Sequence, residues 1–101
     1  MSNAKDEFLE HVEGQNVTCA LIKYERNYGE FTTFVLKNGY TQNDYDLFLQ
    51  SLNFVYDDGY GGQELNGYIW YDDGTWSDRG EYDGSEWWEY QEVPQIPDEC
   101  K

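Results

Sequence analysis

Residues 64–79 read Glu-Leu-Asn-Gly-Tyr-Ile-Trp-Tyr-Asp-Asp-Gly-Thr-Trp-Ser-Asp-Arg, and they point to an antiparallel pair of strands. The aromatic and aliphatic run at 64–71 predicts the first strand. Asp72-Asp73-Gly74 predicts a tight turn, because Asp-Gly before a return strand is a strong hairpin signal. The return strand is expected over 75–79.

The chain after this hairpin is expected to reverse once more. Either Arg79-Gly80 or Asp83-Gly84 supplies the turn, and residues 86–93 form the last strand. Pro94 and Pro97 follow, and proline cannot continue a central strand.

Three further strands are predicted before residue 64. Residues 17–25 are apolar on both faces in the middle, which indicates a central strand, and Cys19 is expected to pack there as a small core residue. Residues 30–37 are β-branched and aromatic and form the return strand of a hairpin. A short strand is expected at 53–57, and a glycine-rich loop follows at 58–63.

Two short helices are predicted. Residues 5–13 place apolar side chains on one face, and Gly14 is a natural residue to end the helix. Residues 42–52 follow Thr41, which with Asp44 resembles a capping box that has Asp in place of Glu. The second helix has one apolar stripe, made of Tyr45, Phe48, Leu49 and Leu52.

These elements predict an α+β fold, with an antiparallel sheet of five or six strands and the two helices packed on one face. Met1-Ser2-Asn3-Ala4 looks like the remnant of an expression tag, so the fold is expected to occupy residues 5–101 as a single domain.

The composition excludes several classes of protein. The 101 residues carry a formal charge of −15, whereas a protein that binds nucleic acid directly needs a basic surface. No apolar run approaches the roughly 20 residues of a membrane span. Cys19 and Cys100 are the two cysteines, and little else suggests secretion, so a reduced cytoplasmic protein is expected, with pairing of the two left open.

The acidic residues are concentrated in the second half of the sequence. Residues 1–56 hold eight acidic and four basic residues, and residues 57–101 hold thirteen acidic and two basic ones. The second half also contains all four Trp and five of the ten Tyr. An acidic, ring-rich docking face is therefore expected there.

No catalytic constellation is recognisable. His11 is the only histidine, and the sequence does not locate a nucleophile beside it. The best carboxylate cluster for a cation comprises Asp72, Asp73, Asp78, Glu81 and Asp83. Its spacing fails the EF-hand pattern, and irregular Ca²⁺ or Mg²⁺ binding stays open beside the simpler interpretation of a solvated acidic face.

Trp87 and Trp88 are adjacent, so they point to opposite faces if 86–93 is a strand. One of these rings therefore faces away from the main core. An exposed apolar patch of this kind usually marks a partner site.

Residues 67–88, which include Gly74-Thr75-Trp76-Ser77-Asp78-Arg79-Gly80-Glu81-Tyr82-Asp83-Gly84-Ser85-Glu86-Trp87-Trp88, resemble a family of small acidic proteins of tailed bacteriophages. That family is uncharacterised. The resemblance covers most of the chain and implies a virus-encoded protein of the host cytoplasm, without implying an activity.

Two functional hypotheses follow from the residues. The first is a monomeric protein, without a cofactor, that binds a basic protein surface and imitates nucleic acid to inhibit a DNA-binding protein. Its expected partner-binding residues are Asp72, Asp73, Trp76, Asp78, Glu81, Asp83, Glu86, Trp87 and Glu89. The alternative is a metal- or carbohydrate-binding module in the Asp- and Trp-rich half.

Overall fold

The structure is a computed structural model, and it describes residues 2–27, 30–56, 64–82 and 85–92. The elements in chain order are β1 (Ser2–Asn3), α1 (Ala4–Val12), β2 (Val17–Asn27), β3 (Glu30–Leu36), α2 (Gln42–Ser51), β4 (Val55–Tyr56), β5 (Leu65–Tyr71), β6 (Trp76–Tyr82) and β7 (Ser85–Gln91). The predicted loop at 58–63, the turn at Asp83-Gly84 and the two prolines lie outside the described residues.

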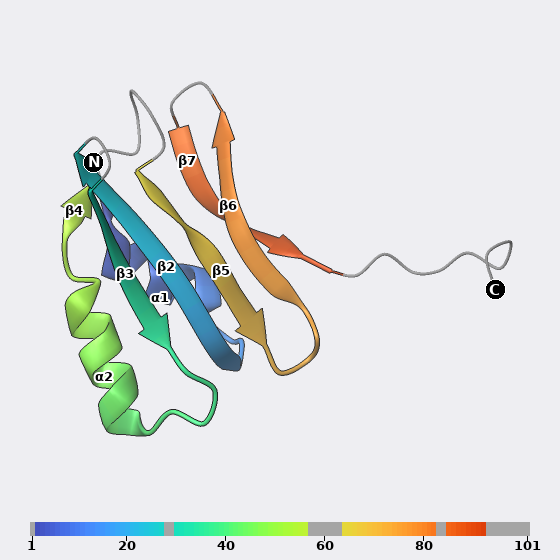
Figure 1. The fold of residues 1–101 in the computed structure, drawn as a ribbon. Helices are drawn as coiled ribbons and strands as arrows, with labels where there is room; N and C mark the ends of the chain where they lie inside the picture. Colours follow the sequence, from blue (N-terminus) through green and yellow to red (C-terminus); the bar gives the residue numbers. More distant parts are fainter. Residues whose placement is uncertain (1, 28–29, 57–63, 83–84, 93–101) are drawn as a thin grey trace, which may run out of the picture.

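The longer strands form one antiparallel sheet in the order β3-β2-β5-β6-β7, and β1 pairs with β4 in a separate two-stranded sheet. Figure 1 shows α1 behind the large sheet and α2 beside the β3 edge, so one face of the sheet is covered by helices. The predicted α+β fold with an antiparallel sheet is confirmed. In the described part of the chain, no helix is both long and apolar enough to cross a bilayer.

The core lies between the helices and the inner face of the sheet. Phe8 of α1 is fully buried and meets Phe48 of α2 edge to face, with ring centroids 5.5 Å apart. Ile22 of β2 and Ile69 of β5 are buried in the same core. Because these side chains come from four elements, the two helices and the central strands share one hydrophobic core.

Residues 2–4 make contacts with the rest of the fold, and their origin in an expression tag stays a prediction. Ser2 and Asn3 pair with Tyr56 and Val55, and Ala4 is 1% exposed. The Asn3 side chain accepts a hydrogen bond from the Asp6 amide at 3.1 Å, which caps α1. Asparagine is a preferred N-cap residue, so this segment supplies a start that residues 5–13 lack by themselves.

The second helix begins as predicted. The Thr41 hydroxyl accepts from the Asp44 amide at 3.1 Å, and the Asp44 carboxylate accepts from the Thr41 amide at 3.0 Å. This is a complete capping box in which aspartate does the work of the usual glutamate.

The structure excludes one of the two alternatives for the second turn and contradicts the expectation for Cys19. Arg79-Gly80 is not a turn, because β6 continues through both residues to Tyr82. Cys19 is a free, half-buried residue on the sheet face opposite the helices instead of a core residue. A register shift between Val17 and Cys19 lets Val17 and Ala20 both face the core, which a strict alternation does not allow.

Candidate functional site

The face of the large sheet that turns away from the helices, here called the outer face, is the most distinctive surface of the molecule. Residues directly opposite one another on paired strands share a face. The register therefore assigns to the outer face Cys19, Leu21, Lys23, Phe31, Val35, Asn66, Tyr68, Trp70, Trp76, Asp78, Trp87, Glu89 and Gln91.

Large rings are exposed on the outer face. Tyr68 is 47% exposed, Trp70 is 38% exposed and Trp87 is 37% exposed. The Tyr68 ring lies 5.7 Å from the Trp70 ring and 6.2 Å from the Trp76 ring, measured between centroids. Rings from β5 and β6 thus form one continuous aromatic surface that neither helix covers.

Two carboxylates stand next to these rings. Asp78 of β6 is directly opposite Glu89 of β7. The Gln91 amide donates to Asp78 at 3.1 Å and to Glu89 at 3.5 Å, and the Trp87 indole donates to Glu89 at 2.8 Å. Directly opposed like charges destabilise a sheet, so these neutral donors only partly offset an unfavourable pair.

Trp87 and Trp88 point to opposite faces, as their adjacency predicts. Trp87 lies over Gly80, where a Cβ atom would stand 2.5 Å from the indole Nε1. Trp88 is 7% exposed on the inner face. A glycine at position 80 therefore lets the Trp87 ring lie flat on the outer face of the β6–β7 hairpin.

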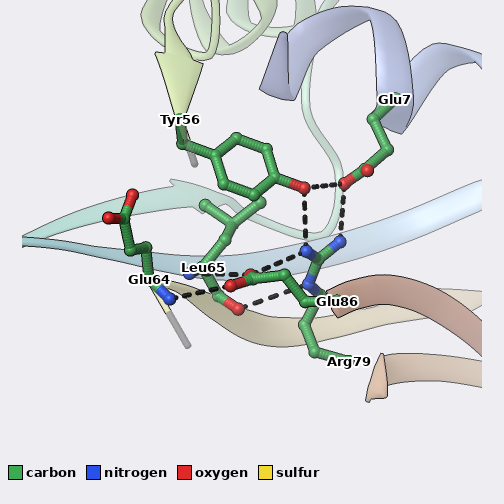
Figure 2. Close-up of polar contacts among 6 residues, drawn as sticks. All are labelled: Glu7, Tyr56, Glu64, Leu65, Arg79 and Glu86. Atoms are coloured by element: carbon green, nitrogen blue, oxygen red, sulfur yellow. Dashed lines mark hydrogen bonds and ion pairs between the residues drawn. The ribbon is translucent and has the colours of Figure 1, made fainter. Parts of the chain in front are cut away.

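The inner face of the same hairpin carries a buried polar cluster centred on Arg79, here called the Arg79 network (Figure 2). The Arg79 guanidinium donates to Glu7 at 2.6 Å, to Glu86 at 2.8 Å and to the Tyr56 hydroxyl at 2.9 Å. The Arg79 side chain is 1% exposed and that of Glu86 is 0% exposed. Burial, and then the hydrogen bond to Glu7, raise the pKa of Tyr56 well above its usual range, so this hydroxyl stays a donor.

The Arg79 network replaces strand pairing where β5 and β6 separate. The two strands pair in register only at Ile69–Ser77 and Trp70–Trp76 along their described lengths. Beyond these pairs, the Glu86 carboxylate accepts from the Leu65 amide at 3.1 Å and Arg79 donates to the Leu65 carbonyl at 3.3 Å. Two charged side chains thereby bond the backbone of β5 at the point where its pairing with β6 ends.

His11 has a hydroxyl partner that the sequence did not reveal. Its Nε2 lies 2.9 Å from the Ser77 Oγ, which lies 2.7 Å from the Tyr71 hydroxyl. Ser77 is 0% exposed, so this histidine and serine resemble a catalytic pair in chemistry but offer a substrate no access. Burial lowers the pKa of His11, Arg79 acts in the same direction, and Glu7 opposes them.

The expected partner-binding residues do not all lie on one surface. Trp76, Asp78, Trp87 and Glu89 lie together on the outer face, and Asp72 and Asp73 lie in the β5–β6 turn. Glu86 is a correction, because it is buried in the Arg79 network and is not available to a partner. Glu81 lies in β6 opposite Glu86, and Asp83 lies outside the described residues.

Most of the outer-face residues were absent from the expected set, and among these Tyr68, Trp70 and Gln91 lie next to the expected ones. Tyr68 and Trp70 share the outward parity of their strand, and Gln91 follows Glu89 by two positions. The alternation within 64–71 contains the signal for the two rings. It needed only the observation that Ile69 faces the core.

The carboxylates do not converge on a metal centre in the described part of the chain, where no group of three or more His, Cys, Asp or Glu side chains is placed to hold an ion. Carbohydrate binding by the rings stays a prediction.

Comparison with known proteins gave no match to a family model, to a curated protein or to a solved structure. The resemblance to the bacteriophage family therefore stays a prediction as well.

Proposed function

We propose that this chain is a binding protein whose outer face docks onto a basic surface of a protein partner. The observation that supports the proposal is an uncovered sheet face on which exposed rings adjoin the opposed carboxylates Asp78 and Glu89. Soluble proteins rarely leave a continuous apolar surface of this kind without a partner.

The rings and the charge contribute differently to such an interface. Tyr68, Trp70 and Trp87 are the residue types that dominate binding energy when they become buried at an interface. The net charge of −15 attracts a basic partner from a distance and accelerates the encounter. The rings therefore anchor the complex, and the field steers its formation.

A partner whose basic surface serves to bind nucleic acid is the natural target for this combination. Such a surface is built to meet closely spaced negative charges. By occupying it, the chain would compete with nucleic acid and act as an inhibitor. Under this proposal the bacteriophage resemblance supplies the setting, a viral protein acting on a DNA-binding protein in the host cytoplasm.

The test is capture of proteins from a bacterial lysate with three immobilised chains. These are the wild type, an outer-face variant that combines Tyr68→Thr with Trp70→Thr, and the control Leu47→Thr, whose leucine is 55% exposed on α2. At about 50 mM salt, the wild type and the control are expected to retain a basic protein that the outer-face variant does not. Raising the salt to about 500 mM should release it, since screening shortens the range of the field.

Adding duplex DNA to the captured complex tests the inhibitory part of the proposal. Release of the partner by DNA is the expected result. Equal capture by the wild type and the outer-face variant would contradict docking through the outer face. If the partner stays bound in the presence of excess DNA, imitation of nucleic acid is contradicted, and docking through the outer face is not.

A further inference from the structure

The inner face of the β6–β7 hairpin shows how this chain binds a guanidinium group. The Arg79 guanidinium carbon lies 4.9 Å from the centre of the Trp88 ring and 5.6 Å from that of the Tyr56 ring. Its nitrogens pair with the carboxylates of Glu7 and Glu86. Figure 2 shows Glu7, Glu86 and Tyr56 around this guanidinium, and the Trp88 ring lies against it as well.

The outer face of the same hairpin also combines aromatic rings with two carboxylates, from residues next to those of the inner face. Trp76 and Trp87 supply the rings, and Asp78 and Glu89 supply the carboxylates. Among the residues that the structure describes, Asp78 and Glu89 have only the Gln91 amide and the Trp87 indole as side-chain donors. The inner set holds an arginine of the chain itself, and the outer set has no cation of its own.

The energetics favour the arrival of a cation. Two carboxylates directly opposite each other repel, and each is only partly exposed to water. A positive group between them would replace this repulsion by attraction. The Trp87 ring rests on Gly80 with one side and is 37% exposed, so a planar group can lie against it.

We propose that the outer face recognises an arginine-bearing segment of the partner, with a guanidinium against Asp78, Glu89 and the Trp87 ring. The inference rests on the proposed function and specifies the partner chemistry at that face. Arginine fits better than lysine, because a guanidinium is planar, stacks on rings and offers several donors to two carboxylates at once. A lysine ammonium is a compact, strongly hydrated charge that gains little from the rings.

The experiment compares two peptides of equal charge, hexa-arginine and hexa-lysine, by titration calorimetry with the full chain at about 50 mM salt. The wild type is expected to bind hexa-arginine about tenfold more tightly, the difference expected from one charge-assisted contact plus ring stacking. Each peptide is also titrated into Asp78→Asn and Glu89→Gln. Both variants should lose most of the preference for arginine.

The matched control is Asp72→Asn, which removes the same charge from an exposed position in the β5–β6 turn. It should weaken both peptides slightly and leave the preference intact. Thermal unfolding checks the fold of each variant, and Asp78→Asn should unfold at the same temperature as the wild type or higher, because it relieves a repulsion.

The outcomes distinguish a failure of the arginine site from a failure of the proposed function. Equal affinity for both peptides, or a preference that survives in Asp78→Asn and Glu89→Gln, overturns the arginine site and leaves docking onto a basic partner standing. Absence of binding by either peptide at low salt contradicts the arginine site and the basic partner together.

Discussion

Arg79 is the residue whose environment contributes most to this architecture. It joins α1 through Glu7, β4 through Tyr56 and β7 through Glu86. A buried ion pair is not in itself evidence of stability, because the desolvation cost can exceed the attraction. The ion pair also has a positioning role, since the Glu86 carboxylate accepts the backbone amides of Glu64 and Leu65 where β5 begins.

Replacing Arg79 by Met should therefore destabilise the fold strongly. The substitution leaves Glu86 buried without its cation, which typically costs about 3–5 kcal/mol. Urea unfolding followed by tryptophan fluorescence measures the loss. The double variant with Glu86→Gln should recover part of it, because the glutamine carbonyl still accepts one amide and no charge is buried; a single variant as stable as the wild type would contradict this account.

His11 predicts a pH dependence of stability. Burial lowers the pKa of His11 in the folded state, with Arg79 adding to the effect and Glu7 opposing it. The neutral form is thus favoured by folding, so the stabilisation is complete above the unfolded value of 6.5 and declines as the pH falls through the folded pKa.

The measurement compares the wild type with His11→Gln at pH 7.5 and at about pH 5. The glutamine variant should be less stable at the higher pH, because it loses the contacts with Ser77 and Tyr90. The difference in stability between the two proteins should shrink at the lower pH, because protonation of His11 then destabilises the folded state of the wild type only. A difference that widens on acidification would show that folding favours the charged imidazole.

At the level of single elements, α2 starts where it does because of its capping box. Thr41 and Asp44 satisfy each other's amides, and the helix then packs Phe48 and Leu52 into the core. The β6–β7 hairpin differs from α2, because one of its faces contains the buried Glu86 and Trp88 and the other contains the exposed Trp87. On the inner face Arg79 and Glu86 belong to the Arg79 network, whereas on the outer face Trp87 is exposed to solvent.

Thr41→Ala should lower the free energy of unfolding by about 1 kcal/mol, the usual cost of losing an N-cap hydroxyl. Chemical denaturation measures this loss. Thr41→Ser keeps the hydroxyl and serves as the matched control, with stability close to that of the wild type. Equal losses in both variants would mean that the methyl group, and not the cap, is what matters at this position.

At the level of the whole molecule, the negative charge is not confined to the outer face. Exposed acids also lie on α1, as Asp6 and Glu10, and on α2, as Asp44 and Asp46. Under the proposed function, the field would therefore attract a basic partner from several sides, and it could not by itself orient that partner. The exposed rings occur with carboxylates on the outer face, and this pairing is what defines a preferred orientation.

The same net charge of −15 predicts that salt stabilises the folded protein. Repulsion among like charges opposes the compact state, and the screening length falls from about 10 Å at 0.1 M to about 3 Å at 1 M. The melting temperature should thus rise between about 20 mM and 500 mM sodium chloride. If the melting temperature of Arg79→Met rises with salt as much as that of the wild type, the effect comes from the overall charge. A melting temperature that falls with salt would mean that surface ion pairs matter more than the overall repulsion.

Local patterns in the sequence were sufficient for both helices, for the strands after residue 16 and for the opposite faces of Trp87 and Trp88. The Asp-Gly turn, the capping residues Thr41 and Asp44, and the adjacent Trp87 and Trp88 each act within a few positions, so each could be recognised from the chain alone. The α+β class followed from the order of those elements. Of the outer face, Trp76, Asp78, Trp87 and Glu89 could be predicted on the same basis.

The remainder depended on contacts between residues far apart in the chain. Nothing local in the sequence distinguishes Glu86 from the other acidic residues around it, and it is buried because Arg79 and the β5 backbone supply its partners. Cys19 reached the outer face through a register shift set by pairing with β5, and Ser77 met His11 across 66 positions. Sequence determines what each segment prefers by itself, whereas the burial of a charge is decided by whether tertiary packing brings it a partner.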